Sequence, residues 1–149
     1  MPSDLRDKLG IAVASRTYKA YRALLDTDRW LRLENTGAKP QRVLWASTGT
    51  KDPEASDVLY IKALAAPHTV NTMPEQTLLA FGEHGEVGAM LAADGGNADE
   101  VLARFAEAGI DYDSLAAKLQ SEGAESFDAS WNELMDCIAS KSKLLTNAG

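Results

Sequence analysis

The chain has 149 residues, of which 45% are hydrophobic and 25% are charged, as is typical of a globular domain with a core of its own. Its formal net charge of −7 disfavours a general nucleic-acid binder, because such proteins usually present a basic surface. The single cysteine, Cys137, excludes an internal disulfide and predicts a cytoplasmic protein with a buried, inert thiol. No apolar run is long enough for a membrane span, and the opening MPSDLRDKLG is not expected to be a signal peptide.

Two helical segments are predicted first, over residues 4–25 and 28–33. In the second, Trp30, Leu31 and Leu33 are expected to turn inward. The basic residues of the first helix are interpreted as its solvated outer face rather than as an anion-binding surface. Its apolar residues recur every three or four positions and form one stripe, which consists of Leu5, Leu9, Ala12, Val13, Tyr21, Leu24 and Leu25.

A strand, a loop and a helix are predicted after the Asn35–Pro40 turn. Residues 42–46 contain three consecutive apolar side chains without alternation, which is typical of a strand buried on both faces of a parallel sheet. Residues 47–53 should form the loop and residues 57–65 the helix. Trp45 is expected to pack in the core rather than to line a site.

A second strand and helix follow. Residues 68–72 are predicted to be extended. Thr72 and Glu75 have the spacing of a capping box, with Pro74 in the first turn, so a helix should run on to about Glu83. Two successive strand–helix units indicate parallel α/β architecture.

Three helices are predicted in the remainder of the chain. The first spans residues 98–108, with Asn97 as its cap, and the second runs from Ser114 to about Ser121, capped by Asp113. The third runs from Phe127 to about Leu145. It has an amphipathic stripe that consists of Phe127, Trp131, Leu134, Met135, Ile138 and Leu145.

The predicted organisation is a single, mostly helical α/β unit with three parts. These are a helical lead-in over 1–35, two strand–helix units over 41–85 and C-terminal helices over 97–145. Two parallel strands would leave unpaired edges and do not form a stable sheet alone. The sequence therefore indicates either further strands that the pattern does not reveal or a part of a larger fold.

Two segments, RVLWASTGTKDP over 42–53 and HTVNTMPE over 68–75, closely resemble the C-terminal part of transaldolases of the longer bacterial form. The segments over 20–42 and 101–112 resemble the same branch, so the similarity covers nearly the whole chain. The resemblance implies a (β/α)8 TIM barrel. Residues 42–46 and 69–72 would be its seventh and eighth strands, and the chain would be a C-terminal fragment.

The resemblance also implies a reaction. The family transfers a dihydroxyacetone unit from a ketose phosphate to an aldose phosphate in the pentose phosphate pathway, through a Schiff base on a lysine of a middle strand. That lysine and the acidic residues of earlier strands lie outside the matched segments. None of the lysines present is predicted inside a buried strand, where desolvation could activate it. We therefore expect no catalytic residue and no cofactor, and a chain that is inactive alone.

Polar residues after the two strands are predicted to bind the substrate phosphate. The last two loops of a β/α barrel often do so, and hydroxyls, a lysine and a helix N-terminus all suit an anion. The simpler alternatives are a plain turn, a solvated lysine, and Thr72 acting only as a helix cap. The predicted phosphate-binding residues are Ser47, Thr48, Lys51, Asn71 and Thr72, with Gly49 allowing close backbone approach.

No metal site is expected, because His68 and His84 are isolated and are predicted to lie at the surface. Three functional hypotheses stay open. The chain could be an inactive piece of a transaldolase, one half of a split enzyme, or a non-catalytic helical module that packs against a partner or a copy of itself. The expected partners are a sugar phosphate and the missing barrel half or a second copy, with no nucleic acid and no membrane.

Overall fold

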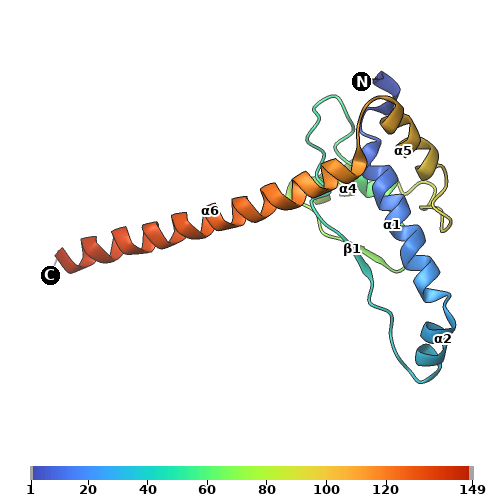
Figure 1. Ribbon diagram of the computed structural model, residues 1–149, viewed down its shortest axis with the longest axis horizontal. Coiled ribbons are helices and arrows are strands. Elements are labelled where there is room, and N and C mark those ends of the chain that lie inside the picture. Colours follow the sequence, from blue (N-terminus) through green and yellow to red (C-terminus); the bar gives the residue numbers. More distant parts are fainter. Residues whose placement is uncertain (1, 148–149) are drawn as a thin grey trace. The chain divides into compact units, whose positions relative to one another are not determined.

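The computed structural model describes residues 2–147 and shows a mostly helical α/β protein (Figure 1). Its contacts divide into two compact units, Met1–Ala108 and Gly109–Gly149, and each is described by itself. The expectation that both parts belong to one barrel stays a prediction. Among the described residues, no helix is both long and apolar enough to cross a membrane.

The first unit contains the two predicted strand–helix pairs, in the predicted order. Strand β1 precedes helix α3, and strand β2 precedes helix α4. The elements of this unit are η1 (Ser3–Leu5), α1 (Leu9–Leu25), α2 (Asp28–Asn35), β1 (Val43–Trp45), α3 (Leu59–Ala63), β2 (Thr69–Asn71), α4 (Glu75–His84) and α5 (Ala98–Glu107).

The helix predicted over residues 4–25 is divided in the structure. Residues Ser3–Leu5 form a 3-10 turn, and α1 begins only at Leu9. Between them Asp7 has a φ of 60°, a left-handed conformation that an α-helix cannot contain. An ion pair between Asp4 and Arg104 connects the short turn to α5, so this segment is held by a contact across the fold.

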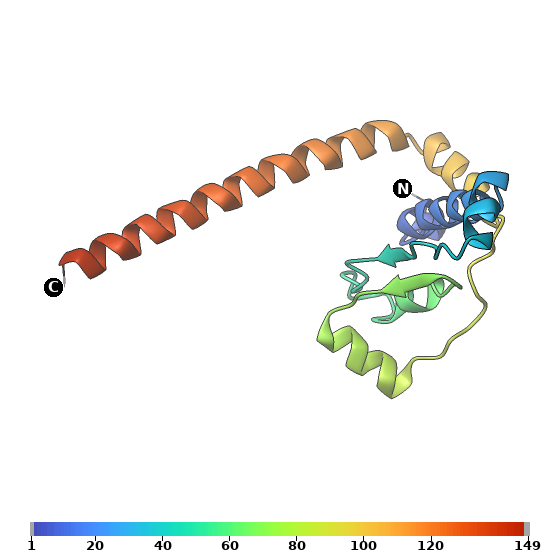
Figure 2. The ribbon, with the colours of Figure 1, turned by 90° about the horizontal axis from the view of Figure 1, so that it is seen from below.

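Strands β1 and β2 pair in parallel, with Leu44 opposite Val70 (Figure 2). The N–H of Thr72 donates to the carbonyl of Trp45 at 2.8 Å and extends the pairing past the ends of both strands. The prediction that β1 is buried on both faces is wrong. Trp45 is 9% exposed, whereas Leu44 is 57% exposed, because α1 and the end of α3 pack only on the face that carries Trp45.

The core of the first unit joins α1, β1 and the end of α3. Tyr18, Trp45 and Leu64 form its buried centre. The Tyr18 hydroxyl donates to the carbonyl of Pro67 at 3.2 Å, so a buried polar atom of α1 has a partner just before β2. Trp45 therefore packs in the core, as predicted, but it also lines the cavity described below, which was not expected. The partly buried residues around this centre are Ala14, Tyr21, Val43, Tyr60, Ala66 and Leu91.

Helix α2 does not contribute to this core. Leu31 and Leu33 are exposed, so the prediction that they turn inward is wrong. The helix lies beside the end of α1, away from the strand pair (Figure 1). The Thr27 hydroxyl accepts from the N–H of Trp30 and caps the helix. Trp30 is partly buried, and capping supports a helix that has no fully buried side chain.

The capping box predicted at Thr72 is also wrong. Helix α4 begins at Glu75, and the residue at its N-cap is Pro74, which makes no side-chain cap hydrogen bond. Thr72 lies before the helix, and its N–H bonds to the carbonyl of Trp45. Asn97 does precede α5, as predicted, but its side chain makes no cap hydrogen bond.

The second unit contains α6 (Tyr112–Asn147), a single helix of 36 residues. Two helices were predicted here, with a break between Ser121 and Phe127 that contains Gly123, and that prediction is wrong. A glycine inside a helix costs only about 1 kcal/mol relative to alanine, and the residues around it favour helix. The cysteine prediction is wrong as well, since Cys137 is exposed on this helix.

The N-terminus of α6 is capped by Asp111, and not by Asp113 as predicted. The Asp111 carboxylate accepts from the N–H groups of Asp113 and Ser114, at 3.0 and 3.1 Å, and from the Ser114 hydroxyl at 2.9 Å. The N–H of Ser114 is the main reason why the pKa of Asp111 lies below its usual value.

We expect the first turn of α6 to depend on pH through Asp111. A carboxyl with a lowered pKa in the folded state stabilises that state above its ordinary pKa of about 3.9, and this stabilisation is lost as the pH falls through the lowered value. Amide exchange at Ser114 should therefore accelerate below that value, and Asp111→Ala should give fast exchange at every pH. Asp136→Ala, further along α6, is the control. Unchanged exchange in Asp111→Ala would contradict the assignment of this cap.

Candidate functional site

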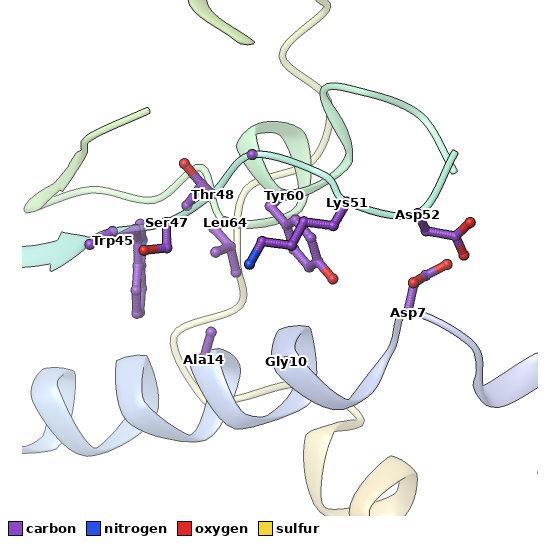
Figure 3. A pocket seen from close by; sticks show the side chains of 12 residues that line it. Asp7, Gly10, Ala14, Trp45, Ser47, Thr48, Lys51, Asp52, Tyr60 and Leu64 are labelled. Atoms are coloured by element: carbon purple, nitrogen blue, oxygen red, sulfur yellow. The ribbon is translucent and has the colours of Figure 1, made fainter. Parts of the chain in front are cut away.

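A cavity of about 440 Å³ lies between α1, the loop after β1 and the start of α3 (Figure 3). The loop provides most of its polar lining, and α1 and α3 provide apolar walls. Its position at the carboxyl end of β1 is where a β/α protein usually places its site. The lining residues are Asp7, Gly10, Ala14, Trp45, Ala46, Ser47, Thr48, Gly49, Lys51, Asp52, Tyr60 and Leu64.

Ser47 and Lys51 both line this cavity. Ser47 has a φ of 57°, which turns the chain sharply directly after the strand. Figure 3 shows the Lys51 side chain extending into the same space as the Ser47 hydroxyl. The site therefore offers a hydroxyl donor and a flexible ammonium to an anion.

The Thr48 hydroxyl, which was predicted to bind phosphate, makes hydrogen bonds within the fold. The Thr48 side chain is 3% exposed, and its hydroxyl lies 2.6 Å from the Asn71 amide oxygen and 3.1 Å from the carbonyl oxygen of Thr72. These bonds connect the loop after β1 to the end of β2. The hydroxyl is thus engaged within the fold, although Thr48 also borders the cavity.

Asn71 and Thr72 do not join the other predicted residues in the cavity. Asn71 lines a separate cavity of about 320 Å³, together with apolar side chains such as Phe81 and Met90. Thr72 is absent from the linings of both cavities. The structure therefore places Ser47, Thr48 and Lys51 at one cavity. Asn71, which ends β2, and Thr72 lie outside that lining, although both contact the Thr48 hydroxyl.

An arginine outside the cavity orders the loop that carries Lys51. Arg6 donates from Nε and Nη2 to the two carboxylate oxygens of Asp52, at 2.7 and 2.9 Å, and also pairs with Glu54. The N–H of Glu54 and the Arg6 guanidinium both lower the pKa of Asp52. Asp52 lines the cavity next to Lys51, so this pairing offsets a negative charge close to the ammonium.

Sequence analysis missed Arg6, Asp7, Asp52 and Tyr60 as neighbours of the site. Arg6 was interpreted as part of a solvated basic face, and its partner Asp52 lies 46 positions away along the chain. Helical spacing carries no information on such a contact. Tyr60 falls within the helix predicted over residues 57–65, and a position on a helix does not by itself place a residue at a cavity.

The described part of the chain contains no cluster of three metal-ligating side chains. His68 and His84 lie at the surface, as predicted. His84 Nε2 lies 2.9 Å from an Asp57 carboxylate oxygen, in an exposed pair of side chains.

A parallel strand pair with a helix after each strand, and with polar side chains at the carboxyl end of the first strand, is the arrangement of β/α enzymes. The sequence pattern of the Transaldolase/Fructose-6-phosphate aldolase family matches residues 2–138. The chain belongs to this family, whose fold is the TIM barrel.

Named relatives agree with this assignment. The chain is 49% identical to a transaldolase of Parafrankia sp. (strain EAN1pec) over 135 residues, which are 90% of this chain and 37% of that protein. It is 47% identical to a transaldolase of Mycolicibacterium smegmatis over 133 residues, 89% of this chain and 36% of the relative. It is also 47% identical to Transaldolase 2 of Streptomyces avermitilis over 131 residues, 87% of this chain and 35% of the relative. The chain thus spans little more than a third of these relatives.

Proposed function

We propose that this chain is the C-terminal portion of a transaldolase barrel, in which β1 and β2 are the seventh and eighth strands. The observation that carries the proposal is the family match over residues 2–138, combined with coverage of only 37% of a relative that is 49% identical. The parallel pairing of β1 and β2 and the exposed Leu44 support it, because barrel strands pack on both faces.

The complete protein would transfer a dihydroxyacetone unit from a ketose phosphate to an aldose phosphate. The Schiff-base lysine would come from the earlier strands, since neither β1 nor β2 contains a lysine. We therefore propose that this chain alone is inactive. Cytoplasmic location and the absence of a cofactor remain predictions from the sequence.

The role proposed for this chain is to hold the substrate phosphate. Lys51 would supply the positive charge and Ser47 a hydrogen bond to a phosphate oxygen. Arg6 and Asp52 would keep the loop in place. Holding the phosphate fixes the sugar relative to the distant lysine, and such positioning lowers the entropic part of the barrier.

Lys51→Ala should raise the KM for phosphorylated substrates by about tenfold and lower kcat much less, because the lost charge binds a part of the substrate that does not react. The enzyme for this test is a chimaera in which residues 2–147 follow the preceding part of the Mycolicibacterium smegmatis transaldolase. Lys39→Ala is the matched control, since Lys39 is exposed and outside the cavity. An unchanged KM in Lys51→Ala would remove Lys51 from the phosphate site.

The split-enzyme hypothesis is the second candidate. The apolar residues exposed along α6 favour it, because they suit a chain that associates with another polypeptide. Such an enzyme would be active only when both polypeptides are present. The non-catalytic module predicts association without any binding of sugar phosphate.

A further inference from the structure

Helix α6 has an apolar face that no described residue covers. Phe127, Trp131, Leu134 and Ile138 follow one another at intervals of four, three and four residues, which places them in one stripe about 60° wide. All are exposed, with Phe127 at 81% and Trp131 at 61%. Four large apolar side chains in one row exceed the scattered exposure that is normal at a protein surface.

The opposite face of α6 is polar. Lys118 and Glu122 form an ion pair at 3.5 Å, one turn apart. Asp136 and Lys143 continue this face toward the end of the helix. The helix therefore has one side suited to water and one side suited to a protein interior.

The sides of the stripe argue against a simple coiled coil between two copies. Such pairs usually place opposite charges beside the apolar seam, where they set the partner and the register. In α6 only one of the flanking positions carries a charge. These positions are Asp128, Ser130, Met135, Cys137, Ser142 and Leu144. The next position along the seam is Lys141, which a paired seam would have to bury. Met135 on one side of the seam and Leu144 on the other widen the apolar surface, as is common in a helix that packs on a globular core.

The length of the relatives identifies the core that could receive this face. The match covers 37% of the Parafrankia transaldolase, so 100 − 37 = 63% of that relative lies outside it. The match to the family reaches residue 138 and so includes the stripe. The strand pair of this chain also lacks cover, since Leu44 is exposed on its open face.

We propose that the apolar face of α6 packs against the β/α units that longer transaldolases carry before the matched region. This inference rests on the proposed function and adds to it a binding surface on α6. The partner is a polypeptide with those units, either in the same chain or as a separate subunit. It is neither a membrane nor a second copy of this chain.

The test is co-expression of the 149-residue chain with the part of the Mycolicibacterium smegmatis transaldolase that precedes the match. The transaldolase part carries an affinity tag, and the 149-residue chain does not. Sedimentation velocity then measures the recovered species. We expect a one-to-one complex. Trp131→Glu should weaken it by at least about tenfold, because a charge would be buried in an apolar interface. Ala129→Glu is the matched control, since it adds the same side chain on the polar face and should leave the complex unchanged.

Cys137 gives a second measurement that does not depend on a mutation. It is the single cysteine of this chain, it is exposed, and it lies at the edge of the stripe. Its reaction with a thiol reagent, followed by mass spectrometry of its peptide, should slow by about tenfold or more in the complex. Circular dichroism of Trp131→Glu should show an intact α6.

Three results would overturn the proposal. The first is recovery of the Trp131→Glu complex in the same amount as the unchanged complex, and the second is no complex at all. The third is a dimer of the 149-residue chain that does not bind the tagged part and that Trp131→Glu abolishes. The proposed function fails separately. A complex that depends on Trp131 but has no transaldolase activity would support the surface on α6 and reject the proposed function. Transaldolase activity that Trp131→Glu does not change would support the function and reject the surface.

Discussion

Replacing Tyr18 by alanine should lower the free energy of unfolding of the first unit by about 3–5 kcal/mol, as expected when a buried aromatic ring is removed from a packed core. Tyr18 is 1% exposed and packs with Trp45 and Leu64, so it joins α1 to β1 and to the end of α3. The loss would leave a cavity at the centre of this core.

Urea unfolding followed by tryptophan fluorescence measures this effect, because Trp45 lies in the same core. Tyr18→Phe should cost only about 1 kcal/mol, since it keeps the ring and loses the hydrogen bond to Pro67. Leu24→Ala, on the exposed side of α1, is the control and should change stability by about 0.5 kcal/mol or less. A Tyr18→Ala protein as stable as this control would mean that the described core does not hold α1 in place.

Replacing Thr48 by valine should destabilise the first unit by about 1–3 kcal/mol. Valine has nearly the shape of threonine but cannot donate, so the amide oxygen of Asn71 and the carbonyl of Thr72 would lose a buried partner. The loop after β1 would also lose its connection to the end of β2, and Ser47 and Lys51 would be less well ordered.

Thr50→Val provides a matched control for Thr48→Val. The Thr50 hydroxyl is buried and has no hydrogen-bond partner in the part of the chain that the structure describes. Its removal should therefore be neutral or stabilising, because no bond is lost with the polar atom. Equal losses of stability in the two variants would show that the Thr48 hydroxyl does not connect the strand ends.

The strand–helix pairs could be predicted from sequence because their signals are local. Three consecutive apolar residues between polar turns indicate a buried strand, and β1 lies where this pattern places it. The family resemblance rested on the segments around these strands, and it is confirmed over residues 2–138.

The incorrect predictions concern residues whose structure depends on a contact with a distant part of the chain, or on the absence of such a contact. Thr72 has the sequence of a helix cap, but its N–H bonds to Trp45 on the neighbouring strand. Leu31 has an inward-facing pattern, but α2 has no core beside it. A break between Ser121 and Phe127 was predicted, but α6 continues through this segment, because its single glycine, Gly123, costs little.

In the candidate site, too, the features that depend on local sequence were predicted and those that depend on distant contacts were not. Ser47 and Lys51 were predicted from residue type and position after a strand, and the structure places both at one cavity. Arg6 was missed because its pairing with Asp52 joins residues 46 positions apart. Asn71 was grouped with the phosphate site because it ends a strand, yet its amide oxygen accepts from Thr48. Residue type therefore indicated the chemistry, while the pairing of side chains required coordinates.

The direct test of the central claim is turnover of a ketose phosphate with an aldose phosphate acceptor, measured on two proteins. One is the 149-residue chain, and the other is the chimaera that adds the preceding part of the Mycolicibacterium smegmatis transaldolase. We expect transfer by the chimaera and none by the chain alone. Transfer by the isolated chain, or a folded chimaera without transfer, would contradict the account.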